Sequence, residues 1–172
     1  MTCIVAVAET GKVWIGGDSA VSIGDSIEIQ RDPKVRKRGK IVIGTAGDGR
    51  WENVIHYGVK IPDITADLDN WVSVDLCDAI RQYLRQCGET EAEKPEGDLL
   101  IGVRGRIYNI DSDWCCFKPV NSYAAIGSGS SAALAALDAG IRGTPKNRIK
   151  RALEIAEKRT PFVRRPFRIV ST

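Results

Sequence analysis

Short apolar runs separated by glycine-containing turns dominate the first quarter of the chain. Residues 2–8 form an almost continuous apolar run, and a second run at 13–15 follows the turn-like tetrad 9–12. Two such runs across a turn predict a β-hairpin. Alternation of polar and apolar side chains over 26–30 is typical of a half-buried strand. The strands predicted in this quarter are residues 2–8, 13–15, 26–30, 34–36 and 41–44.

Apolar residues at helical spacing follow these strands. A short helix is expected to open near residues 48–49, and apolar residues between Val72 and Cys87 recur with the period of a longer helix. Gly88 then stands where helices commonly end. The polar stretch 89–97 predicts an exposed connection.

Strands return in the second half of the sequence. We expect strands at residues 99–103, 106–110, 122–126 and 167–170, and helices at 132–139 and 145–158. Hairpins dominate this order, and strands do not alternate with helices one by one. The pattern therefore predicts an α+β fold in which helices cover the outer faces of antiparallel sheets. With 172 residues and no internal repeat, the chain is expected to form a single domain, 1–172.

The composition is typical of a soluble globular protein, with 43% hydrophobic and 27% charged residues. No apolar run approaches the roughly 18–20 residues of a membrane span. No apolar leader precedes the first predicted strand, so we expect a cytoplasmic protein.

The net charge and the cysteines limit which partners, metals and cofactors the chain is expected to bind. The net charge of +3 and two basic clusters, at 36–40 and at Arg164, Arg165 and Arg168, are too mild to indicate nucleic acid. Solvated faces or subunit contacts are the preferred interpretation. The five cysteines are an odd number without a Cys-x-x-Cys pair, which predicts neither a disulfide framework nor a zinc site. We expect free, mostly buried thiols and no metal or cofactor.

Thr2 is the first candidate catalytic residue, because it stands directly after Met1 and at the start of the first predicted strand. Removal of Met1 would leave a hydroxyl and a free α-amine on one residue. The amine can then take the hydroxyl proton, which is one way to activate a weak nucleophile. An α-amine has a pKa of about 7.7–8.0, close to working pH, so it suits a general base. The plain alternative is that Thr2 is an ordinary second residue.

Other common sites are excluded or weakly supported. The chain has no G-x-x-x-x-G-K-[ST] phosphate loop and no H-E-x-x-H zinc helix. The only histidine, His56, follows apolar Ile55 on a predicted helix, and we interpret it as a partly buried surface residue. Residues 127–132 fit the dinucleotide fingerprint, but the second parallel strand that this fingerprint requires is missing. What remains is a glycine-rich turn that exposes hydroxyls and N–H groups at the start of a helix.

Four further positions stand at the ends of predicted elements. Asp18 follows the second strand, and the hairpin brings it beside the start of the first strand. Lys34 opens a later strand after Pro33, whose fixed φ stiffens the approach. Gly47 lies between a strand and a helix, and Ser128 is expected to cap the following helix. Taken singly, these residues fit structural roles such as a turn cap, an edge lysine or an N-cap.

Taken together, these positions resemble the N-terminal threonine hydrolases of the proteasome β-subunit type, and most closely the bacterial HslV (ClpQ) peptidases. The resemblance extends over nearly the whole chain, and its blocks follow the order of the family. The blocks that carry it are Thr2–Val7, Gly11–Asp18, Lys34–Arg36, Gly44–Gly47, Ala125–Gly129 and Ala152–Ala156.

The resemblance implies catalytic roles for these residues. After loss of Met1, Thr2 would supply its Oγ as nucleophile and its amine as base. Lys34 would lie beside the hydroxyl, where its positive charge favours deprotonation, and Asp18 would hold Lys34 in place. The backbone N–H of Gly47 would form the oxyanion hole.

Two serines complete the implied site. Ser128 would hydrogen-bond near the α-amine and orient it. Ser22 would correspond to the substrate-binding position whose backbone pairs with an extended peptide.

The resemblance also implies an architecture and an assembly. The expected fold is a four-layer αββα sandwich of two antiparallel sheets flanked by helices, the N-terminal-nucleophile (Ntn) hydrolase fold. The implied function is that of a threonine endopeptidase, which hydrolyses unfolded polypeptides inside a ring-shaped homo-oligomer. An AAA+ unfoldase is the implied partner, whereas nucleic acid and membrane are not.

One segment departs from the family pattern. Residues 157–166 contain two prolines and several cations, so the aspartate and the ion-binding loop of the relatives cannot be assigned. A catalytically inactive, proteasome-like structural subunit is therefore an alternative function. A small-molecule amidase that uses the same N-terminal nucleophile is another, and Cys3 would replace Thr2 in it if processing went one residue further.

Overall fold

The computed structural model describes residues 2–88 and 97–172. Its strands are β1 (Ile4–Glu9), β2 (Lys12–Gly17), β3 (Ala20–Ile23), β4 (Ser26–Ile29), β5 (Val35–Arg38), β6 (Ile41–Gly47), β7 (Gly97–Val103), β8 (Arg106–Ile110), β9 (Cys116–Phe117), β10 (Tyr123–Ile126) and β11 (Arg168–Ser171). Its helices are α1 (Gly49–Asn53), the π-helical turns η1 (Val54–Gly58), α2 (Leu68–Asn70), the π-helical turns η2 (Trp71–Leu76), α3 (Cys77–Gln86), α4 (Ser130–Asp138) and α5 (Pro145–Arg159). None of the helices in these two ranges is both long and apolar enough to span a membrane.

β1 is a central strand of the first sheet, whose order is β10-β1-β2-β11 with antiparallel neighbours. Its apolar run is continuous because both faces of the sheet are covered. Val5 and Val7 belong to the core beneath α4 and α5, whereas Ile4 and Ala6 belong to the core between the two sheets. The N-terminal end of the chain is therefore held on both edges and both faces.

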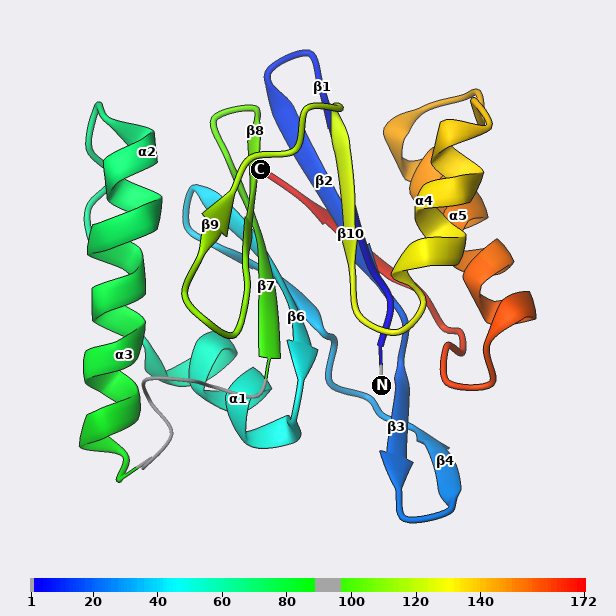
Figure 1. Cartoon of the computed structure of the whole chain (residues 1–172), viewed down its shortest axis with the longest axis horizontal. Coiled ribbons are helices and arrows are strands. Elements are labelled where there is room, and N and C mark those ends of the chain that lie inside the picture. Colours follow the sequence, from blue (N-terminus) through cyan, green and yellow to red (C-terminus); the bar gives the residue numbers. More distant parts are fainter. Residues whose placement is uncertain (1, 89–96) are drawn as a thin grey trace.

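The second sheet has the order β5-β6-β7-β8-β9 and is also antiparallel throughout. β3 and β4 form a separate two-stranded sheet, in which Ser22 pairs with Ile27. This hairpin projects below the two main sheets in Figure 1, near the N-terminus of the chain.

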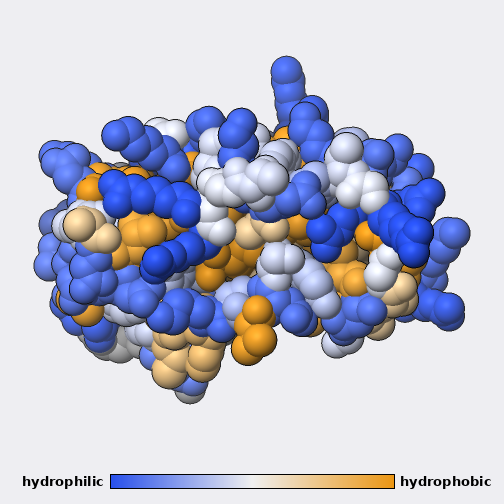
Figure 2. Space-filling model, turned by 90° about the horizontal axis from the view of Figure 1, so that it is seen from above, coloured by the Kyte–Doolittle hydropathy of each residue, from blue (hydrophilic) through white to orange (hydrophobic). Residues whose placement is uncertain are grey.

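The two main sheets and the helices form four layers (Figure 1). α4 and α5 cover the first sheet, and α1, α2 and α3 lie on the outer side of the second sheet. The predicted α+β fold, a four-layer αββα sandwich, is confirmed. Seen from above, hydrophilic side chains cover most of the surface, and hydrophobic surface shows mainly between them (Figure 2).

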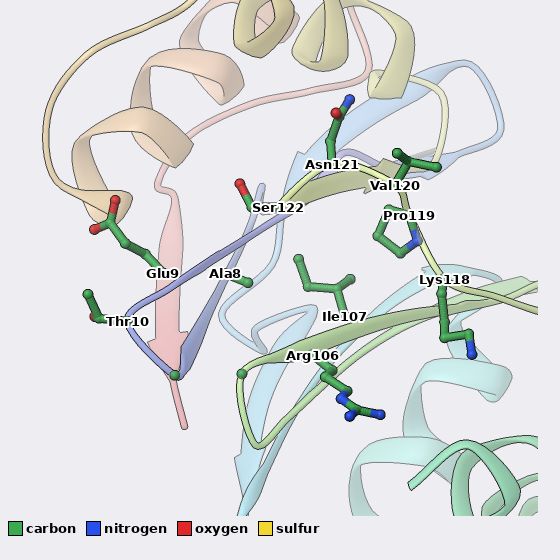
Figure 3. Close-up of a pocket in the computed structure, with 12 residues that line it drawn as sticks. Ala8, Glu9, Thr10, Arg106, Ile107, Lys118, Pro119, Val120, Asn121 and Ser122 are labelled. Atoms are coloured by element: carbon green, nitrogen blue, oxygen red, sulfur yellow. The ribbon is translucent and has the colours of Figure 1, made fainter.

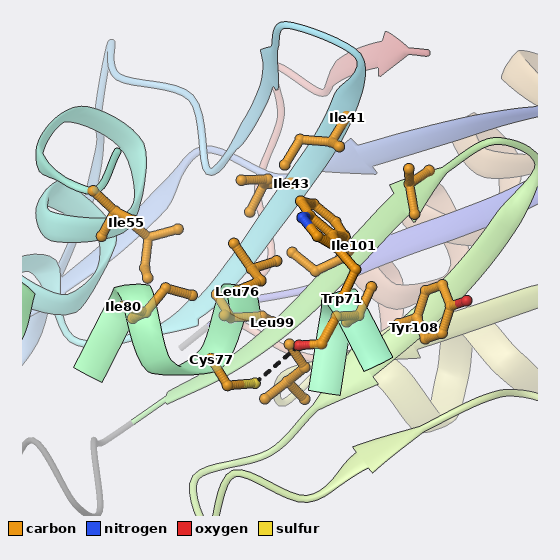
Figure 4. Close-up of a cluster of buried hydrophobic side chains, with 14 of the residues drawn as sticks. Ile41, Ile43, Ile55, Trp71, Leu76, Cys77, Ile80, Leu99, Ile101 and Tyr108 are labelled. Atoms are coloured by element: carbon orange, nitrogen blue, oxygen red, sulfur yellow. Dashed lines mark hydrogen bonds between the residues drawn. The ribbon is translucent and has the colours of Figure 1, made fainter. Parts of the chain in front are cut away.

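The largest apolar cluster lies between the second sheet and the helices that cover it (Figure 4). Trp71 and Tyr108 are its largest fully buried side chains. The Cys77 thiol also lies in this cluster and donates a hydrogen bond to the Val72 carbonyl, with an Sγ–O distance of 3.2 Å. Burial of such side chains contributes about 1.5–3 kcal/mol each, which fixes the second sheet against its helices.

Several boundaries differ from the prediction. The long helical region begins at Leu68 and not at Val72, because the Asp67 carboxylate caps it by accepting a hydrogen bond from the Asn70 N–H. β3 and β9 were not predicted, since each is short and is defined by its partner strand. β7 begins at Gly97, and the rest of the predicted connection, 89–96, lies outside the described residues.

Candidate active site

Thr2 lies directly before β1 and is almost completely buried, with 2% of its surface exposed. Its Oγ1 accepts a hydrogen bond from the Nζ of Lys34 at 3.0 Å. Lys34 precedes β5, so this contact joins the start of the chain to a strand of the second sheet. The structure thus brings together the hydroxyl and the ammonium group that the sequence singled out.

The ammonium of Lys34 is paired with the carboxylate of Asp18. Its Nζ lies 3.2 Å from Oδ1 and 3.4 Å from Oδ2, and both side chains are buried. The carboxylate also accepts hydrogen bonds from the backbone N–H groups of Cys3 and Ala20, each at 3.0 Å. A buried ion pair is tolerated when further hydrogen bonds satisfy its lone pairs, as they do here.

The hairpin explains how Asp18 reaches this position. β1 pairs with β2 so that Ile4 lies opposite Gly17, which sets the next residue, Asp18, beside Cys3. The backbone N–H of Asp18 donates to the Cys3 carbonyl at 3.3 Å. Local strand register therefore places the carboxylate beside Cys3, and Lys34 reaches it from the second sheet.

Cys3 is next to Thr2 but is not prepared for nucleophilic chemistry. It is completely buried, and burial raises the pKa of its thiol to about 12. The neighbouring Asp18 carboxylate raises this pKa further, whereas Lys34 opposes the shift. Since the thiolate is the reactive form, Cys3 is a poor nucleophile at neutral pH.

Ser128 lies in the turn between β10 and α4 and binds the backbone of Thr2. Its Oγ accepts a hydrogen bond from the Thr2 N–H at 3.2 Å and donates to the Thr2 carbonyl at 3.3 Å. The expected N-cap role of Ser128 is wrong, because the N-cap of α4 is Gly129 and no side chain caps this helix. Gly129 instead donates its backbone N–H to the Thr2 carbonyl at 3.1 Å.

Gly127 allows this turn to approach Thr2. Its φ of +84° lies in the left-handed region that favours glycine, and a Cβ at this position would lie 2.4 Å from the Thr2 carbonyl oxygen. The same Cβ would lie 3.3 Å from the Cβ of Ala46. The end of β6 is therefore close to Thr2.

Gly47 follows Ala46 as the last residue of β6 and is exposed. The predicted oxyanion role of its backbone N–H stays a prediction. Ser22 lies half-buried on β3, four residues beyond Asp18. None of the described contacts links its side chain to Thr2, and its predicted role in pairing with substrate concerns its backbone.

His56 is more buried than the sequence analysis expected, with 7% of its surface exposed. Its Nε2 lies 3.0 Å from the Oγ1 of Thr45, and the Thr45 N–H donates to the Lys34 carbonyl at 3.0 Å. Burial, reinforced by the charge of Arg36, lowers the pKa of His56 to about 4. A neutral His56 therefore supports the backbone behind Lys34, and the helical pattern of this segment gave no sign of that contact.

Glu52 is a charged neighbour of the site that the sequence analysis missed. It lies on α1, directly after the turn that begins at Gly47. Burial raises the pKa of its carboxyl to about 7, although Lys34 and a hydrogen bond with Gln30 act in the opposite direction. Its place immediately after a glycine-rich turn was the only available signal.

The raised pKa of Glu52 predicts a pH-dependent stability. Ionisation of this carboxyl destabilises the fold. This destabilisation is absent below about pH 4.5, grows as the pH rises towards 7 and is complete above pH 7. We expect Glu52→Gln to leave the Tm unchanged near pH 4 and to raise it at pH 8. The expected increase in Tm is about 2–4 °C, which corresponds to roughly 1 kcal/mol of unfolding free energy. This is less than the free energy of the full pKa shift, because the side chain is partly solvated.

Thermal unfolding of both proteins at the two pH values measures this difference. Glu28→Gln is the matched control, because Glu28 is an exposed glutamate on β4. An equal gain at pH 4 and pH 8, or a gain in the control, would contradict the assignment.

A pocket of about 500 Å³ lies away from this site (Figure 3). It is lined by the β1–β2 turn from Ala8 to Gly11, by residues 105–107 and by residues 118–122. Thr2 is at the opposite end of β1, roughly 20 Å from Ala8 at the rise of an extended chain. The pocket is therefore separate from the Thr2 cluster.

Comparisons with known proteins bear on the sequence and the fold of the chain. No family model matches the chain. It is 29% identical over 163 residues to the ATP-dependent protease subunit HslV of Caldicellulosiruptor saccharolyticus, covering 90% of this chain and 89% of that protein.

Solved structures share the fold at lower identity. BPH of Thiobacillus denitrificans in complex with epoxomicin has a TM-score of 0.86 at 16% identity, covering 99% of this chain and 98% of that one. HslV of Trypanosoma brucei has a TM-score of 0.75 at 21% identity, with 99% and 98% covered. The sequence match bears out the resemblance to the HslV peptidases. The solved structures show that the chain shares the fold of these proteasome-like proteins.

Proposed function

We propose that this chain is a threonine endopeptidase that cleaves unfolded polypeptides after Met1 has been removed. The observation that carries the proposal is the 3.0 Å contact between the Thr2 Oγ1 and the Lys34 Nζ. That ammonium is itself held by the buried carboxylate of Asp18. A hydroxyl beside a fixed cation loses its proton more readily than one in water.

In the proposed first step, the α-amine of processed Thr2 takes the proton from its own hydroxyl while Oγ1 attacks the peptide carbonyl carbon. The resulting oxyanion accepts a hydrogen bond from the Gly47 N–H. Collapse of this intermediate breaks the peptide C–N bond, and the α-ammonium returns its proton to the leaving amine. An ester between Thr2 and the acyl part of the substrate remains.

In the second step, water attacks this ester, and the α-amine again acts as the base. The carbonyl–Oγ1 bond breaks, the proton returns to Thr2, and the carboxylic acid product leaves. The Ser128 Oγ, which lies 3.2 Å from the Thr2 nitrogen, would orient the amine in both steps. The backbone around Ser22 would pair with the extended substrate on β3.

The comparisons support the same proposal. The relative from Caldicellulosiruptor saccharolyticus is described as a subunit of an ATP-dependent protease, and the Thiobacillus denitrificans structure is a complex with epoxomicin. By analogy, we propose a homo-oligomeric ring that encloses the Thr2 residues and receives unfolded chain from an AAA+ unfoldase. Enclosure would protect other proteins from an otherwise accessible peptidase.

An inactive structural subunit is the second candidate function. The observation that favours it is the divergent segment 157–166, which contains Pro161, Pro166 and several cations. Under this alternative, the Thr2–Lys34 contact would be retained only for its contribution to packing.

Mass spectrometry distinguishes the two candidates. We expect the purified chain to lack the mass of one methionine residue and to gain one adduct on Thr2 when treated with a peptide epoxyketone. Such a reagent needs the hydroxyl and the free amine of the same residue, so Lys or Cys side chains do not give the same product. An intact Met1 with no adduct would support the structural subunit.

A further inference from the structure

Arg164 lies in the segment 157–166, which departs from the family pattern. Its Nη1 donates hydrogen bonds to the carbonyl oxygens of Glu157, Thr160 and Val163, at 3.4, 3.1 and 2.8 Å. These three carbonyls follow one another around the end of α5 and converge on one nitrogen. The basic cluster at Arg164, Arg165 and Arg168 was expected to be a solvated face or a subunit contact, whereas the Arg164 side chain binds the backbone of its own loop.

The main chain of the same residue reaches the candidate active site. The Arg164 N–H donates to the Oδ2 of Asp18 at 3.4 Å, and the Arg164 carbonyl accepts a hydrogen bond from the Ser19 N–H at 2.9 Å. The side chain of Arg164 therefore shapes the loop, and its backbone touches the carboxylate that holds Lys34.

Neighbouring contacts keep the loop against the site. The Arg165 guanidinium forms a forked ion pair with Glu157, with N–O distances of 2.7 and 3.1 Å to Oε2. This pairing lowers the pKa of Glu157, so the pair stays charged. Ser19 donates its hydroxyl to the Pro166 carbonyl at 2.6 Å.

The resemblance implies an ion-binding loop in this region, and the residues present do not fit one. Converging carbonyl oxygens are ligands that hard cations use. Here the Arg164 Nη1 lies within hydrogen-bond distance of all three oxygens, so the place of a metal ion is filled by a guanidinium nitrogen. A guanidinium is always charged and supplies N–H donors, although one nitrogen with two hydrogens must share a hydrogen among three acceptors.

We infer that Arg164 is a built-in cation that organises residues 157–163 and thereby positions Asp18 behind Lys34. Arg164 is a positioning residue, because it acts through Asp18 and does not touch Thr2. Its effect on peptide cleavage rests on the proposed function, whereas its effect on the loop does not.

The test combines Arg164→Ala with chemical rescue. We expect this variant to unfold several degrees lower than the parent and to cleave peptides about 10- to 100-fold more slowly, as misplaced catalytic groups do. Guanidinium chloride at about 50 mM, far below its unfolding range, should restore part of the Tm and part of the cleavage. Tetramethylammonium chloride should restore neither, since it has no N–H donor.

Two matched variants separate charge from packing. Arg164→Lys keeps a cation and should retain more stability and cleavage than Arg164→Ala. Arg159→Ala removes an exposed arginine from the last residue of α5 and should change neither measurement. Should Arg164→Ala fail to fold, its recovery on refolding with and without guanidinium gives the same comparison.

Three results would overturn the inference: an unchanged Arg164→Ala protein, a loss that guanidinium does not reverse, or equal rescue by tetramethylammonium. The Tm measurements do not depend on catalysis. Failure of the proposed peptidase would therefore appear as an inactive parent protein whose loop still responds to guanidinium.

Discussion

Replacement of Thr2 by alanine is expected to abolish peptide cleavage while leaving the fold and the assembly unchanged. The variant lacks only the Oγ1 atom and one methyl group, but it loses the atom that would form the ester with substrate. Removal of a nucleophile from a preorganised hydrolase typically lowers kcat by about 10³-fold or more. Cleavage of a fluorogenic peptide, together with the size of the particle in solution, measures both parts of this expectation.

Thr2→Ser is the control for that experiment. Serine keeps the hydroxyl and the adjacent amine, so it should retain cleavage well above the level of the alanine variant. Cleavage by Thr2→Ala that equals the parent would eliminate the proposed mechanism, because this variant has no hydroxyl at position 2 to attack the substrate.

Lys34→Met is expected to lose both activity and stability. The substitution leaves the Asp18 carboxylate buried with no ammonium beside it, although the Cys3 and Ala20 N–H groups still donate to it. Breaking a buried ion pair in this way costs about 3–5 kcal/mol. Cleavage should fall by about 10²–10⁴-fold, the contribution of a positioned group to proton transfer.

A second substitution separates these two effects. Asp18→Asn combined with Lys34→Met removes both charges, so the double variant should regain much of the stability measured by chemical unfolding. It should not regain cleavage, because the Thr2 hydroxyl still lacks a neighbouring cation. Lys37→Met, on an exposed lysine of β5, controls for loss of a lysine as such. Restored cleavage in the double variant would show that Lys34 has no chemical role.

The predicted place of Asp18 depends on local strand register, whereas the predicted contact of Lys34 with Thr2 joins the two sheets and was implied by the resemblance. The run at residues 2–8 and the following turn define the β1–β2 hairpin, and this hairpin alone brings Asp18 beside Cys3. A short-range pattern is sufficient for such a contact, since every residue between the two is in the hairpin or its turn.

The parts that the sequence did not predict depend on contacts between distant segments. From residue type and place alone Ser128 fits an N-cap, and its contact with Thr2 was implied only by the resemblance. The approach of β10 to β1 brings its hydroxyl to Thr2. In the sequence Arg164 is one cation among several. No pattern of residue types predicts that three carbonyl groups converge at the end of a helix. The pKa of Glu52 depends on burial, which follows from the packing of α1 and cannot be seen in its own neighbours along the chain.

The interior position of β1 determines when Thr2 loses its conformational entropy. A residue fixed in a single conformation loses about 1–2 kcal/mol of backbone freedom. Thr2 precedes a strand that is paired on both edges, and its own carbonyl and nitrogen are already bonded to the 127–129 turn. That freedom is therefore lost once, when the protein folds, and no part of it would have to be removed again in each cycle of the proposed cleavage.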